Sequence, residues 1–270
     1  MGSLEKLETE LRLRAFSPRT IQSYMYYNKK FLEFAKKEPE QASEEDIKNY
    51  IAGLMGRNIS PKSIILIKAA LKFFYDEILK RGIVNLKSPK VSKKLPVVMT
   101  REEVKSLINS AKNEKHKLII SLLYSSGLRL SELINLKVGD IELEEKIGWV
   151  RSGKGAKDRL FILPNALIED LKKQTSGKNE TNFIFSGYNE QMTPRNVQKI
   201  VALAAKKAGI NKSVHVHSLR HSFATHLLES GENIRKIQIL LGHTSLSTTE
   251  LYTHISTDDL KKIKSPLDNL

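Results

Sequence analysis

Apolar side chains recur every three to four residues through the first ninety positions of the chain, between short polar breaks. This spacing matches the 3.6 residues of one α-helical turn, so each stretch predicts a helix with one buried face. A capping serine, followed by proline or by acidic residues, marks the starts of three helices at Ser17, Ser43 and Ser60. Together with a helix near residues 3–14, the pattern predicts a compact bundle of four helices.

Residues 87–96 interrupt this pattern with a lysine-rich run that contains Pro89 and Pro96. Such a composition is typical of a solvated, semi-extended linker. We therefore expect two domains, over residues 1–86 and 97–270, joined by this segment.

The second half of the chain mixes helical and strand patterns. Thr100 and Glu103 have the spacing of a capping box, and an apolar helix expected over residues 116–126 ends at Gly127. Further helices are expected after Thr193, after Val216 and over residues 233–241.

Two short apolar runs, residues 147–151 and 159–163, predict β-strands, and the glycine-containing segment 152–158 between them suits a hairpin turn. Residues 183–185 are a candidate third strand. The predicted fold is therefore mainly α in two domains: a four-helix bundle, and a second α-rich domain with a small antiparallel β-sheet.

Charge narrows the choice of partner. The 270-residue chain has 45 Lys and Arg against 30 Asp and Glu, a formal net charge of +15. Residues 1–95 have 19 basic and 11 acidic side chains (+8), and residues 96–270 have 26 and 19 (+7). Two basic domains suit a polyanion, and nucleic acid is the first candidate, although a lysine-rich surface can also serve solubility alone.

Two absences from the sequence exclude whole classes of protein. The chain has no cysteine, which excludes a disulfide framework, a thiolate metal site and a cysteine nucleophile. No apolar run approaches the ~20 residues that span a bilayer. We expect a cytoplasmic protein with no membrane segment.

Residues 217–254 gather side chains suited to phosphate chemistry. His217 and Arg220 are three residues apart, so on a helix they share one face, where an imidazole and a guanidinium can hold an anion. Tyr252 is the candidate nucleophile; a free phenol has a pKa of about 10 and needs cationic neighbours or a base to react at neutral pH. Ser247 and Glu250 form a capping-box pair just before it, which places Tyr252 in a short helix.

Each of these side chains also has a plainer interpretation. A lone tyrosine in a helix usually packs against its neighbours, and His217 with Arg220 could simply bridge helices. His217 and His221 also have the i, i+4 spacing of zinc sites. Because no glutamate stands between these histidines and Arg220 would place its charge beside the metal, we favour phosphate over zinc.

Three further residues are candidates for the same site. Arg129 stands where one helix ends and another begins, either as a second guanidinium for the phosphate or as a surface partner of Glu132. Lys154 lies in the predicted hairpin turn between two glycines, which let a backbone approach a ligand; a flexible basic loop is the alternative. His243 follows a helix-ending glycine and, taken alone, is a surface or capping histidine.

The order and types of these motifs resemble the tyrosine recombinase (phage integrase) family, most closely its Xer branch of archaea and bacteria. The likeness covers nearly the whole chain, from the Ser17-Pro18-x-Thr20 start onward. The matching motifs are Gly127-Leu128-Arg129-x-Ser131-Glu132-Leu133, Gly153-Lys154-Gly155, His217-x-x-Arg220-His221, Leu240-Leu241-Gly242-His243 and Tyr252-Thr253-His254.

This resemblance implies a core-binding, SAM-like helical domain followed by a catalytic domain, in a site-specific recombinase that cuts and rejoins duplex DNA. Tyr252 would attack the scissile phosphate to give a 3′-phosphotyrosyl link and a free 5′-hydroxyl. Because one phosphodiester replaces another, no nucleotide, metal or other cofactor is expected.

The resemblance also implies a role for each of the other five candidates. Arg129 and Arg220 would stabilise charge on the non-bridging phosphate oxygens. Lys154 would protonate the departing 5′-oxygen. His217 would accept a proton and bind the phosphate, and His243 would donate a hydrogen bond to it.

The implied partners follow from the same resemblance. They are double-stranded DNA and further copies of the chain, as a homo-tetramer on two DNA sites that resolves chromosome dimers at a dif-like site during chromosome partition. The segment after Tyr252 would dock on a neighbouring protomer. Relaxation of DNA by a type IB topoisomerase, and a DNA-binding protein of the same fold without activity, stay open as alternatives. The target sequence and control by a septal DNA translocase are open as well.

Overall fold

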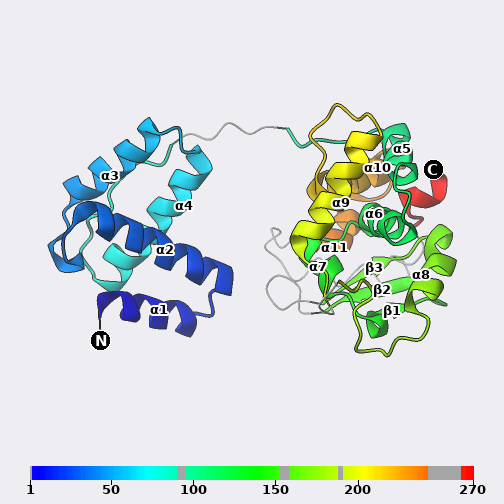
Figure 1. The fold of residues 1–270 in the computed structure, drawn as a ribbon, viewed down its shortest axis with the longest axis horizontal. Coiled ribbons are helices and arrows are strands. Elements are labelled where there is room, and N and C mark those ends of the chain that lie inside the picture. Colours follow the sequence, from blue (N-terminus) through cyan, green and yellow to red (C-terminus); the bar gives the residue numbers. More distant parts are fainter. Residues whose placement is uncertain (1, 90–94, 152–157, 188–190, 243–262) are drawn as a thin grey trace. The chain divides into compact units, whose positions relative to one another are not determined.

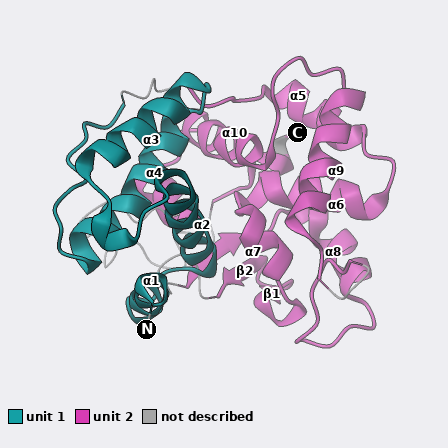
Figure 2. Ribbon diagram, turned by 60° about the vertical axis from the view of Figure 1, so that its left-hand side comes forward, with its two compact units in different colours: residues 1–94 teal, residues 95–270 magenta. Residues whose placement is uncertain are grey.

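The computed structural model describes residues 2–89, 95–151, 158–187, 191–242 and 263–270. The chain forms two compact units, residues 1–94 and 95–270 (Figure 2). Each unit has its own hydrophobic core. The predicted linker, residues 87–96, contains the junction of the two units, and the exact domain limits stay a prediction.

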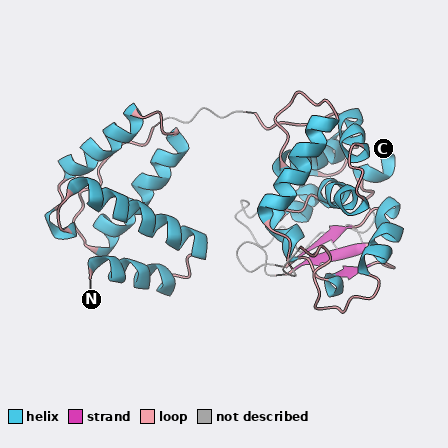
Figure 3. Ribbon diagram, viewed as in Figure 1, coloured by secondary structure: helices cyan, strands magenta, loops and turns pink. Residues whose placement is uncertain are grey.

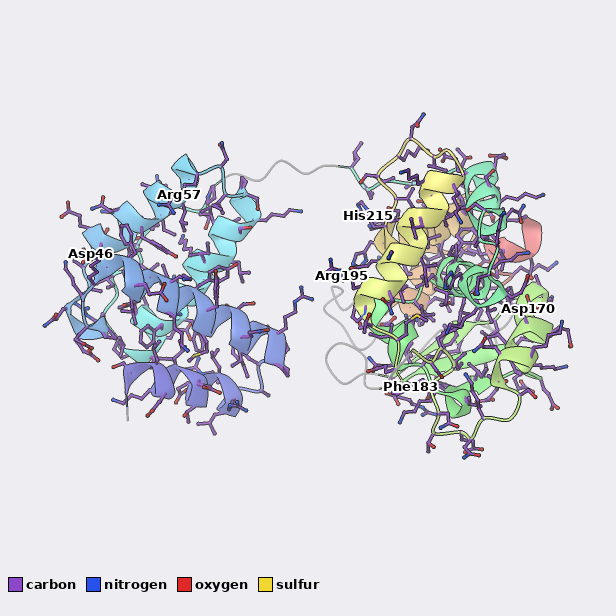
Figure 4. The ribbon with its side chains drawn as sticks, viewed as in Figure 1. Asp46, Arg57, Asp170, Phe183, Arg195 and His215 are labelled. Atoms are coloured by element: carbon purple, nitrogen blue, oxygen red, sulfur yellow. The ribbon has the colours of Figure 1, made fainter. Side chains whose placement is uncertain are left out.

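The first unit is the helical bundle that the apolar spacing predicts (Figure 1). Its helices are α1 (Ser3–Leu13), α2 (Pro18–Ala35), α3 (Glu44–Gly56) and α4 (Pro61–Lys72). The hydroxyls of Ser17, Ser43 and Ser60 each accept a hydrogen bond from the backbone N–H three residues on, which confirms the three predicted starts. At Ser43 the cap is reciprocal, because Asp46 in the first turn of α3 accepts the Ser43 N–H at 2.8 Å (Figure 4).

The fourth helix is followed by a π-helical turn, η2 (Phe73–Ile78), where the sequence predicts only a continuous α-helix. The Leu79 amide donates to the carbonyl of Phe74, five residues back, at 3.0 Å. The side chains of Phe73, Phe74 and Tyr75 are all buried. Because an α-helix with one buried face cannot bury three consecutive large side chains, we attribute the wider turn to their shared burial.

The second unit is built around one buried helix, α6. Its helices are α5 (Arg101–Asn109), α6 (Glu114–Ser126), α7 (Leu130–Asn135), α8 (Ile168–Thr175), α9 (Pro194–Lys207), α10 (Val216–Glu229) and α11 (Ile234–Leu241). The α6 helix packs against α5, α8, α9 and α10, and its side chains from Leu118 to Ser126 are all buried. It ends at Gly127, whose φ of +59° is the left-handed conformation that favours glycine after a helix.

The sheet of this unit has three antiparallel strands in the order β1–β2–β3 (Figure 3). They are β1 (Ile141–Glu142), β2 (Ile147–Val150) and β3 (Arg159–Ile162). The predicted hairpin is confirmed, with Gly148 opposite Phe161. The candidate third strand at residues 183–185 is wrong, because Phe183 forms only an isolated bridge with Lys137, and β1 takes that place in the sheet (Figure 4).

The last eight residues pack on the second unit itself. Ile263 is buried in its core, and the Ser265 hydroxyl donates to the Ser125 carbonyl in α6 at 3.0 Å. Lys105 on α5 donates to the carbonyl of Leu270 at 2.8 Å. Within this single chain, residues 263–270 pack on their own unit, and docking of the segment after Tyr252 on a neighbouring protomer stays a prediction.

Among the helices that the structure describes, none is both long and apolar enough to cross a membrane.

Candidate active site

One buried carboxylate gathers three guanidinium groups in the second unit. Glu132, on α7, accepts hydrogen bonds from Arg129 Nη1 at 2.7 Å and from Arg159 Nη2 at 2.6 Å. Arg220 Nη1, on α10, lies 4.0 Å from the same carboxylate. Two of the predicted site residues, Arg129 and Arg220, are thus brought together from elements ninety residues apart in the sequence.

Local structure fixes Arg129 in this cluster. Arg129 is the residue just before α7, and its backbone N–H donates to Glu132 Oε2 at 2.8 Å. This contact satisfies one of the free N–H groups of the helix start and orients the carboxylate toward the guanidinium. Arg129 does pair with Glu132, but the alternative that this is a surface ion pair is wrong, because Glu132 is only 8% exposed.

The carboxyl end of α11 forms the other wall of the cluster. Three successive carbonyls, those of Leu240, Leu241 and Gly242, accept hydrogen bonds from Arg159, Arg220 and Arg129 respectively. The distance from Arg129 Nη2 to the Gly242 oxygen is 3.0 Å. The last carbonyls of a helix have no partners within it and carry partial negative charge, so cations are stabilised there. Gly242 itself ends the helix with φ +62°, as the sequence predicts.

Burial and mutual repulsion shift the pKa values of the cluster. Burial and the nearby charges of Arg129 and Arg159 lower the pKa of Arg220 to about 9, which still leaves it charged at neutral pH. Burial lowers the pKa of Arg159 as well. Burial alone would raise the pKa of Glu132, but the arginines and their hydrogen bonds hold it below its ordinary value of 4.5. Counted as three guanidiniums and one carboxylate, the cluster has a formal charge of +2.

The cluster opens to solvent mainly at Arg129. The side chain of Arg129 is 25% exposed, against 7% for Arg220. Arg129 lines an open hollow of about 600 Å³ together with Ser131, Lys137 and Arg151. Arg220 is not in the lining, and its Nη1 donates to the Gly127 carbonyl at 2.6 Å. An anion in the hollow would therefore meet Arg129 first.

A second hollow of about 650 Å³ lies between the start of α6 and α9. Lys112, Lys115, Lys199 and Lys207 are among its lining residues, and none of the three predicted site residues that the structure describes lines it. Size therefore does not identify the site in this chain; the convergence of charges on Glu132 does.

Helix α10 places the predicted His217 one turn before Arg220, with its side chain exposed. Partial burial, His217 and Arg220 lower the pKa of His221 on the same helix. Within the described parts of the chain, no group of three His, Asp or Glu side chains is placed to hold a metal ion. The structure thus gives His217 a position beside Arg220 in the helix.

The other three predicted residues, Lys154, His243 and Tyr252, lie outside the described residues. The flanks of two of these segments converge on the cluster. Strand β3 begins with Arg159, five residues after Lys154 in the sequence, and Gly242 immediately precedes His243.

Two members of the cluster were not predicted as site residues from the sequence. The sequence offers Glu132 only as a partner of Arg129, and Arg159 only as the first residue of the strand expected over residues 159–163. A signal for Arg159 was present: the four residues that follow it, 160–163, are all apolar instead of alternating. Such a run indicates a strand buried on both faces, and an arginine at its head can be buried with it.

Family models match both halves of the chain. The model for the N-terminal SAM-like domain of phage integrases matches residues 4–84, and that for the phage integrase family matches residues 97–258. Among curated relatives, the tyrosine recombinase XerA of Pyrococcus furiosus is 41% identical over 267 residues, covering 96% of this chain and 91% of the relative. XerA of Pyrococcus horikoshii is 39% identical over 265 residues, with the same coverage of each.

Solved structures show the same likeness. The crystal structure of a XerA recombinase shares 33% sequence identity and a TM-score of 0.53, covering 96% of this chain and 95% of that one. A lambda integrase dimer bound to a COC′ core site reaches a TM-score of 0.73 over 90% of this chain and 94% of that one. Its identity of 22% supports the fold alone.

Proposed function

The chain belongs to the phage integrase family and is a tyrosine recombinase, and from this premise we propose that the arginine cluster around Glu132 is the site where a DNA phosphate is cut and rejoined. The observation that carries the proposal is the convergence of Arg129 and Arg220 on one buried carboxylate beside an open hollow. A phosphodiester is an anion, and guanidinium groups match its oxygens with paired N–H donors.

The cluster charge suits the reaction. A phosphodiester carries one negative charge, and its five-coordinate transition state carries two. The three arginines and Glu132 sum to +2, so attraction grows as the transition state forms. Donors held in place before the reaction stabilise such developing charge, and loss of one typically costs about 10²–10³ in rate. Each described contact of Arg129 and Arg220 uses only part of its five N–H donors, which leaves others for phosphate oxygens.

We assign the bond changes as follows. The Tyr252 oxygen forms a bond to phosphorus while the bond from phosphorus to the 5′-oxygen breaks. His217 accepts the phenolic proton, Lys154 gives a proton to the departing 5′-oxygen, and His243 donates a hydrogen bond to the phosphate. Attack by a 5′-hydroxyl on the phosphotyrosine reverses these changes and rejoins a strand. This chain supplies each step from its own side chains.

We further propose the biological setting that the resemblance to the Xer branch implies. Four copies of the chain would bind two double-stranded DNA sites, and the product would be a resolved chromosome dimer at a dif-like site. The reaction would take place in the cytoplasm, where chromosomal DNA lies. The net charge of +15, shared between the two halves of the chain, supports contact with DNA by both.

The reaction class is tested with a duplex that contains a nick close to the scissile phosphate, so that the cut fragment diffuses away and the covalent intermediate accumulates. We expect a denaturation-resistant protein–DNA adduct from the wild type and none from Tyr252→Phe. Tyr26→Phe, a change at an exposed tyrosine of the first unit, is the matched control and should leave adduct formation unchanged. An adduct of equal yield from Tyr252→Phe would contradict the proposal.

Recombination is separated from topoisomerase activity on a plasmid with two target sites. Recombination predicts deletion or inversion products that need both sites, and no relaxation of a plasmid that lacks a site. Relaxation of any supercoiled plasmid without recombinant products would instead favour a type IB topoisomerase. Binding without any strand breakage would favour a DNA-binding protein of the same fold.

A further inference from the structure

We propose that Arg159 is a positioning residue for the strand-cutting reaction. Its guanidinium joins Glu132 to the carboxyl end of α11, and through these two supports it fixes the orientation of Arg129 and Arg220. The inference rests on the proposed function of the arginine cluster and extends it to a residue outside the predicted catalytic set.

The contacts of Arg159 show what it can hold. Its Nη2 donates to Glu132 Oε2 at 2.6 Å, while Arg129 uses the other oxygen, Oε1. Its Nη1 donates to the Leu240 carbonyl. The carboxylate is therefore clamped from both sides, and neither oxygen can rotate away from Arg129 without breaking a charge-assisted hydrogen bond.

The end of α11 is the second support. The carbonyl held by Arg159 is the first of three in succession, and the next two orient the guanidiniums of Arg220 and Arg129. Because consecutive carbonyls of a helix end share one backbone, fixing Leu240 also fixes the positions of the Leu241 and Gly242 oxygens. Arg159 thus acts on both arginines through Glu132 and the carboxyl end of α11.

Gly242 shows how tightly Arg159 is packed against this backbone. A Cβ atom added at Gly242 would lie 2.6 Å from Arg159 Cδ and 3.0 Å from its Nε. Glycine is needed there for two reasons, the positive φ of +62° and the close passage of the arginine stem. The glycine of the Leu240-Leu241-Gly242-His243 motif therefore makes room for Arg159.

The burial of Arg159 indicates that it acts through neighbouring residues. The Arg159 side chain is 8% exposed, and its Nε has no hydrogen-bond partner within the described structure. A buried charge with an unpaired donor costs stability, so a purely structural role would be filled better by an apolar side chain. Displacing a catalytic group by about 1 Å can cost ~10²-fold in rate, which gives such an arginine a function in catalysis.

The test is a double-mutant cycle between Arg129 and Arg159, read in single-turnover cleavage of the nicked duplex. The variants are Arg159→Met, Arg129→Ala and the two combined, with DNA affinity measured for each. Lys172→Met is the matched control, because Lys172 is a long, exposed cation on α8 whose ammonium pairs with Glu169 at 2.9 Å. We expect Arg159→Met to cut about 10²-fold more slowly with DNA affinity within threefold of wild type.

The combined variant decides between mechanisms. If Arg159 acts by holding Arg129 and Arg220 in place, the double variant should cut more slowly than Arg129→Ala alone, because Arg220 also loses its support. The further loss should be clearly smaller than the factor of about 10² that Arg159→Met costs with Arg129 present. Losses that multiply would overturn the proposal, because they are expected both from an independent contact to phosphate and from general loosening of the fold. A cleavage rate of Arg159→Met within threefold of wild type would overturn it too.

Arg159→Lys keeps the test decisive if Arg159→Met does not fold. One ammonium can hold Glu132 or the Leu240 carbonyl but lacks the planar fork that reaches both, so an intermediate rate and the same lack of additivity with Arg129→Ala are expected. The failure of the proposed function would look different. It would appear as a wild type that forms no adduct, or as Arg129→Ala cutting at the wild-type rate, and the role of Arg159 would fall with it.

Discussion

The two units of this chain bury different kinds of side chain. In the described part of residues 1–94 the interior is aliphatic and aromatic, and Asn28 is the one polar residue among its buried side chains. In the described part of residues 95–270 the interior also contains two arginines, a glutamate and a histidine, together with several serines. Both units are mainly helical, so the difference does not come from secondary structure.

The contrast separates buried side chains that stabilise a fold from buried side chains that give it a function. Apolar burial is the main favourable contribution to folding, whereas a buried ion pair often contributes no more than apolar side chains of the same volume. The first unit therefore needs no buried charge. The second keeps Glu132 with Arg159 and Arg220 in its interior, and we take phosphate chemistry as the reason.

The largest expected effect on stability comes from removing the shared carboxylate. Glu132→Ala leaves two buried guanidiniums, Arg159 and Arg220, without their counter-ion, which should destabilise the second unit by about 3–5 kcal/mol. Hydrogen exchange followed by mass spectrometry should show a loss of protection in residues 95–270 and unchanged protection in residues 1–89. Glu169→Ala, at a side chain that is 74% exposed, should change neither.

An apolar change of similar size should act on the first unit alone. Phe31 is fully buried, and Phe31→Ala should destabilise that unit by about 3–5 kcal/mol through lost contacts and a cavity. Hydrogen exchange should increase in residues 3–78 while protection around Glu132 stays as in the wild type. Equal losses in both units would mean that they unfold together, and the comparison between them would fail.

Replacing a buried tyrosine by phenylalanine should change the free energy of unfolding in opposite directions in the two units. Tyr124 and Tyr75 are both fully buried tyrosines. The Tyr124 hydroxyl pairs with His226 Nδ1 at 2.8 Å, so Tyr124→Phe leaves a buried ring nitrogen unpaired and should cost about 1–3 kcal/mol. The Tyr75 hydroxyl has no hydrogen-bond partner in the described structure, so Tyr75→Phe should be neutral or stabilising. Urea unfolding of both variants checks the signs.

Mild acid should weaken the second unit first. All seven histidines lie in residues 95–270. Burial lowers the pKa of His226 below 6.5, so its neutral form is favoured in the folded state and the unfolded chain takes up the proton first. Stability is therefore complete above pH 6.5 and falls as the pH drops from there toward the folded pKa, by at most about 1.4 kcal/mol per pH unit for each such histidine.

The first unit provides the internal reference for this pH effect. Its Asp46, paired with Lys37 and the Ser43 cap, has a pKa lowered from 3.8 to about 2, so its contribution to stability is lost only as the pH falls from about 4 toward 2, below the range of this experiment. Hydrogen exchange between pH 7 and pH 5, corrected for the intrinsic exchange rate, should show weakening in residues 95–270 alone. His226→Gln should flatten the profile, and an unchanged profile in that variant would assign the effect to another group.

Much of the fold could be predicted from the sequence because its signals are local. Serine and threonine caps, helix-ending glycines and the strand pair on either side of residues 152–158 each depend on a few neighbouring residues. Within the described residues, the helices and strands that these signals predict are present. The short helix expected from Ser247 and Glu250 lies outside them. The π-turn at residues 73–78 was missed because its cause is tertiary: three consecutive aromatic residues share one core. The edge strand β1 was missed because two residues carry no periodicity.

The candidate site was predictable in part for the same reason. Motif spacing identified Arg129 and Arg220, and the structure brings them together. No local pattern revealed that Glu132 would be the buried centre between them, since a glutamate three residues after an arginine is ordinarily a surface partner. Arg159 is linked to Glu132 and Leu240 across 27 and 81 residues of sequence, and only the fold shows that contact.

The central claim is that the buried charges of the second unit serve transfer of a DNA phosphate to Tyr252. Its most direct test is the single-turnover rate at which the covalent adduct forms at Tyr252, compared between the wild type and Arg220→Met at saturating DNA. We predict an adduct mapped to Tyr252 that forms about 10²–10³ more slowly in Arg220→Met, with the second unit still folded. An Arg220→Met rate within threefold of the wild type, or an adduct on a different residue, would contradict the account.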